Sequence, residues 1–279
     1  MIQSYGELFR NEINKETVTP IIGVYDVFSA TVAAKYYNAL FISGFSFAAS
    51  YYGLPDIGFI AWSDMTAFVQ RIRTVLPNHH LLVDIDDGYA DSEVACHVVS
   101  LLEAIGASGI VIEDQKRPRR CGHYDGKEIL ELEQFLVKLN KVLYARRDLV
   151  VIARTDVHDE KEALERARAF SDAGADAVLV DAVNNVGMIK RLRDKVNKPV
   201  VYNQLAGGKS PWYDLATLAE NGASIVLYST PCLFAAQAGV EDAIRSIKEK
   251  DFVLDNIRSA DLGSCTRLLN SNLDRRKKK

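Results

Sequence analysis

Two clusters of acidic residues follow two short apolar runs, at positions 81–83 and 109–112. Carboxylates that converge on one spot repel one another unless a cation lies among them, and oxygen ligands suit a hard ion such as Mg²⁺. The simpler alternative is that strand-end acids only cap the helices that follow them. We predict a Mg²⁺ site among the acids of the two clusters, which are Asp84, Asp86, Asp87, Glu113 and Asp114.

The segment between the two clusters explains why acids from both would meet. Apolar residues recur at helical spacing from 93 to 105, and Gly106 follows as a stop signal. The stretch that begins at His80 therefore contains a strand, a helix and a second strand. A right-handed crossover of this kind makes the strands parallel, so both clusters are expected at the same edge of one sheet.

A basic segment at 116–123 combines a thiol with an imidazole and reads Lys-Arg-Pro-Arg-Arg-Cys-Gly-His. A thiol among cations is expected to have a lowered pKa, so that Cys121 can serve as acid, base or nucleophile. The segment lies in one of two long loops rich in Gly, Pro and polar residues, at 45–63 and 115–130. Such a loop over an active site is a natural lid. The alternative is that the basic residues serve an interface and that Cys121 is incidental.

The elements that must position these groups recur along the whole chain. Eight apolar runs are typical of strands, and helical segments follow them, the last at 233–248. Because the runs are continuous rather than alternating, both faces of the sheet are expected to be buried. We predict an α/β fold, a (β/α)8 TIM barrel over residues 1–250, with a C-terminal helical extension and basic tail at 251–279. The strand-like runs are 19–24, 39–42, 81–83, 109–112, 149–153, 177–180, 199–202 and 224–227.

In a barrel of this kind the active site lies at the carboxyl ends of the strands. The alternative fold, an open doubly wound sheet, requires a phosphate-binding glycine motif at its first turn. Neither GxGxxG nor GxxxxGK[ST] is present in the sequence. The polar residues found at the predicted strand ends are Tyr25, Asp26, Ser43, Asp84, Asp86, Glu113, Arg154, Asp181 and Asn203.

Composition indicates which partners and which cellular compartment to expect. With 34 basic and 37 acidic residues among 279, the net charge of -3 argues against a nucleic-acid partner. The four cysteines are widely spaced and form no CxxC motif, which favours reduced thiols in a cytoplasmic protein. The N-terminus lacks a signal-peptide pattern and no apolar run is long enough to span a membrane, so we expect a soluble protein without a membrane partner. The basic run at 275–279 is expected to be a frayed tail, and 251–267 a further helix or an arm exchanged with a partner.

Four motifs resemble the isocitrate lyase/phosphoenolpyruvate mutase superfamily, and the resemblance runs in order from about 19 to 248. They are Val-Asp-Ile-Asp at 83–86, Ile-Glu-Asp-Gln at 112–115, Arg-Arg-Cys-Gly-His at 119–123 and Ala-Arg-Thr-Asp at 153–156. The Cys-Gly-His lid is similar to that of the carbon–carbon lyases of the superfamily, such as methylisocitrate and dimethylmalate lyases. The run also resembles carboxyphosphonoenolpyruvate phosphonomutase.

The resemblance implies a barrel with a swapped helix, a Mg²⁺ cofactor and a homo-oligomer, usually a tetramer. It also implies roles for matching positions in this chain. Asp84, Asp86 and Glu113 would position the hydrated metal. The residues that would hold the substrate carboxylate are Ser43, Gly44 and Phe45.

Other matching positions would surround the substrate. Cys121 would donate a proton from the lid, and Arg154 and Asn203 would bind substrate oxygens. Tyr25 would line the site beside the reacting atoms. The remaining substrate-binding positions implied are Asp26, Gly122, His123 and Asp181.

The chain departs from the lyases of this superfamily at several positions. Arg119 stands where the lyases have Lys, and a guanidinium is a poor proton shuttle. Asp181 stands where they usually have Glu, Ala206 where they have another acid, and Phe234 where an arginine is expected. These changes remove charge from the part of the pocket that distinguishes substrates.

The function expected is therefore a Mg²⁺-dependent lyase of methylisocitrate or dimethylmalate lyase type with an altered small 2-oxo or 2-hydroxy acid substrate. Cleavage of the bond next to a carbonyl leaves an enolate, which Mg²⁺ and Arg154 can stabilise. The first alternative is a carboxyphosphonoenolpyruvate phosphonomutase, which rearranges a C–P bond of a phosphonate. The second is a non-catalytic barrel that serves as a binding partner.

Overall fold

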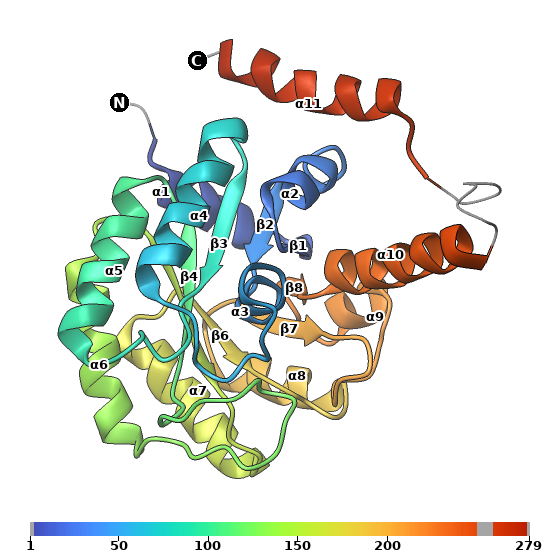
Figure 1. Cartoon of the computed structure of the whole chain (residues 1–279). Helices are drawn as coiled ribbons and strands as arrows, with labels where there is room; N and C mark the ends of the chain where they lie inside the picture. Colours follow the sequence, from blue (N-terminus) through green and yellow to red (C-terminus); the bar gives the residue numbers. More distant parts are fainter. Residues whose placement is uncertain (1–2, 250–258, 278–279) are drawn as a thin grey trace.

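Eight parallel strands pair in sequence order and close into a barrel (Figure 1). The structure, a computed structural model, describes residues 3–249 and 259–277. The strands are β1 (Thr19–Val24), β2 (Ala39–Ile42), β3 (His80–Asp84), β4 (Gly109–Glu113), β5 (Val150–Thr155), β6 (Ala177–Val180), β7 (Val200–Gln204) and β8 (Ile225–Tyr228). The predicted (β/α)8 barrel is confirmed.

Helices surround the barrel and connect its strands (Figure 1). α1 (Tyr5–Ile13) covers the amino-terminal end of the barrel, because its Phe9 and Ile13 join inward-facing strand residues in one buried cluster. The remaining helices are α2 (Val27–Ala33), α3 (Gly44–Phe47), the π-helix η1 (Ala48–Tyr52), α4 (Trp62–Val75), α5 (Ser92–Ala104), α6 (Leu132–Ala145), α7 (Glu160–Ala173), α8 (Gly187–Lys195), α9 (Leu215–Glu220), α10 (Pro231–Glu249) and α11 (Leu262–Lys277).

Successive strand residues pack into two different cores. Leu82 and Val111 lie in the cluster inside the barrel, whereas Val83 and Ile110 lie in the larger cluster between strands and helices. Every residue of β4 is buried, in agreement with the prediction of strands covered on both faces. The carboxyl ends of the strands are therefore held on a rigid frame.

From the sequence we expect a helix at 29–37 with Ser29 near its N-cap, but α2 starts earlier. The N-cap is Asp26, whose carboxylate accepts a 2.6 Å hydrogen bond from the backbone N–H of Ser29. The Ser29 hydroxyl accepts in return from the N–H of Asp26 at 3.1 Å. This reciprocal capping box satisfies N–H groups of the first turn that have no partner within the helix. The helix consequently begins two residues earlier, at Val27.

Residues 275–277 of the basic run belong to a helix rather than to the frayed tail expected, and 278–279 lie outside the described residues. α11 lies across α2 and α4 (Figure 1), and the Asn272 amide donates to the Thr31 hydroxyl at 2.9 Å. Arg275 and its basic neighbours form the last turn of α11, where cations interact favourably with the helix dipole. The further helix or arm expected at 251–267 falls partly outside the described residues, at 251–258, and α11 begins at Leu262.

None of the helices within 3–249 and 259–277 combines the length and apolar character needed to cross a membrane.

Arg73 supports the amino-terminal side of the barrel, and its removal gives a stability prediction. The buried guanidinium donates to the carbonyl oxygens of Gly106, Leu76 and Pro77, and it lies 4.0 Å from the ring centroid of Tyr5. Arg73→Met is expected to lower the free energy of unfolding by about 2–4 kcal/mol, because it leaves buried carbonyls without donors. Urea denaturation measures this change.

Arg71→Met is the matched control, since Arg71 lies exposed on the same helix. It should change the free energy of unfolding by less than about 0.5 kcal/mol. Equal unfolding midpoints for the two variants would contradict the role given to Arg73.

Candidate active site

A cavity lies at the carboxyl ends of the strands and collects most of the predicted site residues. Gly44, Asp86 and Glu113 lie directly behind its lining, and the Gly44 N–H donates to Asp84 Oδ2 at 3.3 Å. The predicted residues that line the cavity are Ser43, Phe45, Asp84, Cys121, Gly122, His123, Arg154, Asp181 and Asn203. Groups from six different strand ends and from the lid loop therefore face one space.

Tyr25 and Asp26 are not brought to this cavity. The Asp26 carboxylate caps α2, as described above. Tyr25 faces a separate apolar groove beside α2, together with Phe28 and Cys232. Strand-end position and the family resemblance both made these residues candidates, but the turn into α2 places Asp26 at the helix N-cap and Tyr25 in the groove.

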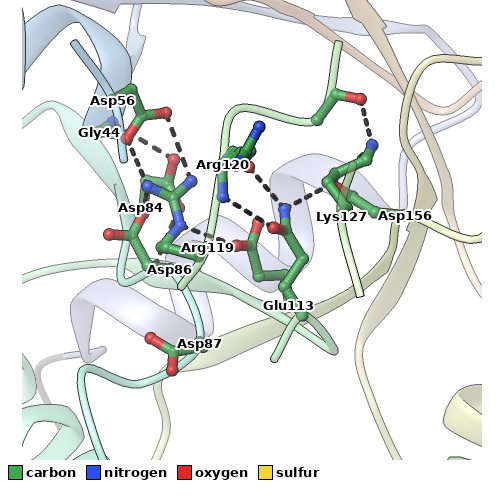
Figure 2. A network of polar contacts seen from close by, with 12 residues as sticks. Gly44, Asp56, Asp84, Asp86, Asp87, Glu113, Arg119, Arg120, Lys127 and Asp156 are labelled. Carbon is green, nitrogen blue, oxygen red and sulfur yellow. Dashed lines mark hydrogen bonds and ion pairs between the residues drawn. The ribbon is translucent and has the colours of Figure 1, made fainter. Parts of the chain in front are cut away.

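Arg119 joins the lid to the acids at the base of the cavity (Figure 2). Its guanidinium is 1% exposed and donates from Nε to Glu113 Oε1 at 2.9 Å. Nη1 donates to Asp56 and lies 3.3 Å from Asp86 Oδ1. Asp56 was not predicted from the sequence, because an isolated acid in a long loop carries no periodicity or motif that marks it. Arg119 thus bridges three carboxylates that come from separate segments.

Burial disfavours the charged form of the acids behind the cavity, although Arg119 contacts Asp86 and Glu113. Burial raises the pKa of Asp84, raises that of Asp86 well above its usual range, and raises that of Glu113 to about 8. Asp86 Oδ1 and Glu113 Oε2 are buried and have no hydrogen-bond partner among the described residues. Within that part of the chain, no three His, Cys, Asp or Glu side chains converge as direct ligands of one ion. The arrangement fits a cation held largely through its own water molecules, and Mg²⁺ keeps its waters readily.

Asp87 takes no part in this cluster. Arg117 binds its carboxylate with two hydrogen bonds of 2.8 Å, one to each oxygen. Figure 2 shows Asp87 apart from the network around Arg119. The prediction of a metal site is therefore narrowed to acids other than Asp87.

A chain of hydrogen bonds fixes the polar wall beside the acids, where Arg154 Nε lies 3.4 Å from Glu113 Oε2. Arg154 donates to both oxygens of Asp156, at 2.7 and 2.9 Å, and its Nη2 lies 2.7 Å from Asp181 Oδ2. The Asn203 amide donates to Asp181 Oδ1 at 2.9 Å and accepts from the Ser229 hydroxyl at 2.5 Å. These residues end four successive strands, so the barrel itself sets their spacing.

The environment of Cys121 corrects the expectation of a lowered thiol pKa. Burial, and then the carboxylate of Asp56, raise the pKa of Cys121 to about 12. The cations that precede Cys121 in sequence point elsewhere, Arg119 to the acid cluster and Arg117 to Asp87. The thiol therefore remains protonated near neutral pH. It suits a proton donor rather than a thiolate nucleophile.

His123 presents a hydrogen-bond donor to the cavity. Its Nδ1 accepts from the Lys209 backbone N–H at 2.9 Å, so the proton of the neutral ring lies on Nε2. Burial lowers the pKa of His123, which favours this neutral form. Nε2 is buried without a hydrogen-bond partner among the described residues and lies 3.6 Å from Asp181 Oδ1.

The lid loop is closed over the site by buried polar contacts. Lys127 donates to the Gly122 carbonyl and lies 3.3 Å from Asp156 Oδ2. The Gln115 amide donates to Asp156 Oδ2 and to the Arg120 carbonyl, both at 2.8 Å. Asp156 therefore holds the lid and Arg154 at the same time, so lid closure and the polar wall are linked.

Gly122 gives a prediction about this closure. A Cβ at this position would lie 2.1 Å from Asp181 Oδ2, 2.3 Å from Arg154 Nη2 and 2.9 Å from Asp156 Oδ2. Gly122→Ala is therefore expected to hold the lid away from Arg154 and to lower kcat/KM about 10²-fold, the cost of a displacement near 1 Å. Steady-state kinetics on the substrate identified below measures it.

Gly126→Ala is the control, because Gly126 lies in the same loop and a Cβ there would approach only the Arg120 side chain, at 3.4 Å. Its positive φ of 79° adds local strain but no contact with the cavity. A Gly122→Ala enzyme as active as Gly126→Ala would contradict the closed geometry.

The fold and site together define a class of protein, a (β/α)8 barrel with a buried acid cluster, a neutral thiol and a closed lid at its carboxyl-terminal face. Comparison with known proteins identifies the family. The family described as phosphoenolpyruvate phosphomutase matches residues 9–248. This chain belongs to that family, within the phosphoenolpyruvate mutase/isocitrate lyase superfamily.

Named relatives include both lyases and mutases. The 2-methylisocitrate lyase of Aeropyrum pernix is 31% identical over 249 residues, which cover 88% of this chain and 80% of that protein. The carboxyvinyl-carboxyphosphonate phosphorylmutase of Arabidopsis thaliana is 28% identical, covering 90% and 76%. The crystal structure of a 2,3-dimethylmalate lyase superposes with a TM-score of 0.91 at 27% identity and covers 100% of this chain and 95% of that one. The protein is accordingly an enzyme of a lyase and mutase superfamily.

Proposed function

We propose that the protein is a Mg²⁺-dependent carbon–carbon lyase that acts on a small 2-hydroxy or 2-oxo acid through an enolate. The observation that carries the proposal is the buried thiol of Cys121 in the same cavity as Arg154 and Asp84, where burial raises the pKa of the thiol. A lyase must return a proton to the carbon left by cleavage, and a neutral thiol holds that proton ready.

The residues proposed for the metal are Asp84, Asp86 and Glu113. Buried carboxylates with partnerless oxygens support this assignment, since a hydrated divalent cation would compensate their charge. When bound, Mg²⁺ would supply positive charge for the oxyanion that develops in the reaction. The substrate carboxylate is proposed to lie at the residues implied by the family resemblance, which are Ser43, Gly44 and Phe45.

The chain's own residues account for the bond cleavage. The C2 hydroxyl of a 2-hydroxy acid, or of the hydrate that a 2-oxo acid forms with water, passes its proton to a carboxylate that lines the cavity and becomes a carbonyl. The electron pair of the C2–C3 bond remains on C3 as an enolate. Arg154 stabilises the negative oxygen, because its charge is fixed in place by Asp156 and desolvated. Cys121 donates its proton to C3, and the thiolate regains the proton that the hydroxyl released.

A phosphonomutase is the second candidate. It is favoured by the phosphorylmutase among the relatives and by the donors of Arg154 and His123, which suit a phosphonate as well as a carboxylate. In that reaction the enolate recaptures the migrating group, so Cys121 has no proton to deliver. The non-catalytic barrel has less support, because the relatives named above are lyases and a phosphorylmutase.

We further propose a cytoplasmic homotetramer, with a barrel domain at 1–250 and an extension at 251–279. Free cysteines support the location. α10 extends away from the barrel (Figure 1), and no residue described in it is buried. An apolar groove beside α2, with Phe28 and Tyr36 exposed at 44% and 73%, supports exchange of this helix with a second copy.

The function is tested by assaying the purified protein with Mg²⁺ against 2-oxo acids, 2-hydroxy diacids and phosphonates. We expect carbon–carbon cleavage of at least one acid that stops when EDTA removes the metal. Turnover that continues in EDTA, or turnover of phosphonates alone, would contradict the proposed lyase.

A further inference from the structure

The number of cationic side chains in the cavity limits how many acidic groups a substrate can carry. Among the described residues that line it, Arg154 is the one Arg or Lys side chain. Its Nε and Nη2 are already bound by Asp156 and Asp181, whereas Nη1 has no hydrogen bond or ion pair within the described residues. One guanidinium nitrogen is therefore left for a substrate anion.

The other buried cations next to the cavity are already paired with carboxylates, and Lys127 lies 3.3 Å from Asp156 Oδ2. The Arg119 guanidinium is surrounded by Asp56, Asp86 and Glu113. His123 is neutral and offers its Nε2–H, which lacks a partner in the described part of the chain. Arg154 Nη1 and His123 Nε2 can thus bind one acidic group of a substrate, and the metal side of the cavity can bind another.

The remaining wall holds apolar, acidic and neutral polar side chains but no cation. Leu179, Leu205 and Leu227 line the cavity. The Phe45 ring, also in the lining, packs edge-on against Phe234 with centroids 6.0 Å apart. A third carboxylate placed there would lose its hydration without gaining a cation.

The closed cavity is smaller than a diacid or a tricarboxylate. Its volume of about 30 Å³ holds roughly two water molecules. The lid must move outward even for a small diacid, and a tricarboxylate requires more space in the same place.

We propose that the substrate carries two acidic groups, with only hydrogen or alkyl groups at its other positions, and that tricarboxylates are rejected at Phe234. This proposal rests on the lyase function and names its substrate class. Phe234 lies on the first turn of α10, with its N–H bound to the carbonyl of Thr230, which lines the cavity. The ring thus occupies a point from which a longer cationic side chain can reach the cavity.

The test compares wild type, Phe234→Arg and Phe234→Met in the presence of Mg²⁺. Substrates are 2,3-dimethylmalate and oxaloacetate as diacids and 2-methylisocitrate as the tricarboxylate. We expect the kcat/KM of wild type for the better diacid to exceed that for 2-methylisocitrate by at least about 10²-fold. This is the discrimination of a site with unpaired polar groups. Phe234→Arg should lower the ratio of kcat/KM for the diacid to kcat/KM for the tricarboxylate about 10-fold or more. Phe234→Met removes the ring without adding charge, so this ratio should stay within a few-fold of wild type.

A binding measurement tests the substrate class independently of lyase activity. Calorimetry with Mg²⁺ compares succinate with propane-1,2,3-tricarboxylate, and we expect succinate to bind more tightly to wild type and the tricarboxylate to gain affinity in Phe234→Arg. Cleavage of 2-methylisocitrate as fast as the diacids, or tighter tricarboxylate binding to wild type, overturns the inference while the lyase function stands. Absence of all turnover counts against the lyase function, and the binding order then decides the substrate class.

Discussion

Replacement of Cys121 by serine is expected to lower kcat about 10²-fold or more, the usual cost of losing a general acid. Serine keeps the size of the side chain, but a hydroxyl gives up a proton far less readily than a thiol. Arg119 in the lid cannot replace it, because a guanidinium keeps its proton. His123 is a poor substitute, because burial lowers its pKa and the N–H of a neutral imidazole is a very weak acid. Single-turnover kinetics on the preferred diacid measures the change.

Cys96→Ser is the matched control, because Cys96 is a partly buried thiol on α5, away from the cavity. It should leave kcat within about two-fold, as expected for a substitution outside the site. A Cys121→Ser enzyme as fast as Cys96→Ser would favour the phosphonomutase, in which Cys121 delivers no proton.

The second large loss of activity is expected for Asp86→Asn. Asp86 has φ of 53°, a left-handed conformation that Asn adopts more readily than most residues, so the backbone should be preserved. The substitution removes one negative charge from the acid cluster and weakens the hold on the metal. We expect kcat/KM to fall about 10³-fold, the scale of several kcal/mol of lost charge stabilisation. Mg²⁺ affinity by calorimetry should fall at least about 10-fold.

Asp87→Asn is the control for this prediction, since Asp87 lies in the same loop but pairs with Arg117. Its Mg²⁺ affinity should stay within a few-fold of wild type, and thermal unfolding should show that both variants fold. Equal Mg²⁺ affinity of Asp86→Asn and wild type would remove Asp86 from the metal site.

The fold could be predicted closely because local pattern and topology agree. The runs predicted at 19–24, 39–42 and 177–180 match β1, β2 and β6 residue for residue. Continuous apolar runs with helices between them leave few other ways to bury every strand. Once the barrel is predicted, residues at strand ends such as Asp84 and Arg154 must face a common space.

The parts that could not be predicted depend on side-chain direction and on contacts distant in sequence. Asp56 meets Arg119 across 63 residues, and no local pattern indicates that pair. The thiol pKa of Cys121 follows from burial and from where its basic neighbours point, not from their number. Tyr25 and Asp26 show the same limit, because the capping of α2 directs them away from the cavity.

Solvent deuterium incorporation tests the central claim most directly. Wild-type enzyme in excess over the preferred diacid is allowed one turnover in D₂O with Mg²⁺, and the carboxylic acid product is examined by NMR. If Cys121 protonates the enolate, the product carries one deuterium on the carbon next to its carboxylate, since the thiol proton exchanges with solvent beforehand. A product without deuterium at that carbon would contradict the proposed lyase mechanism.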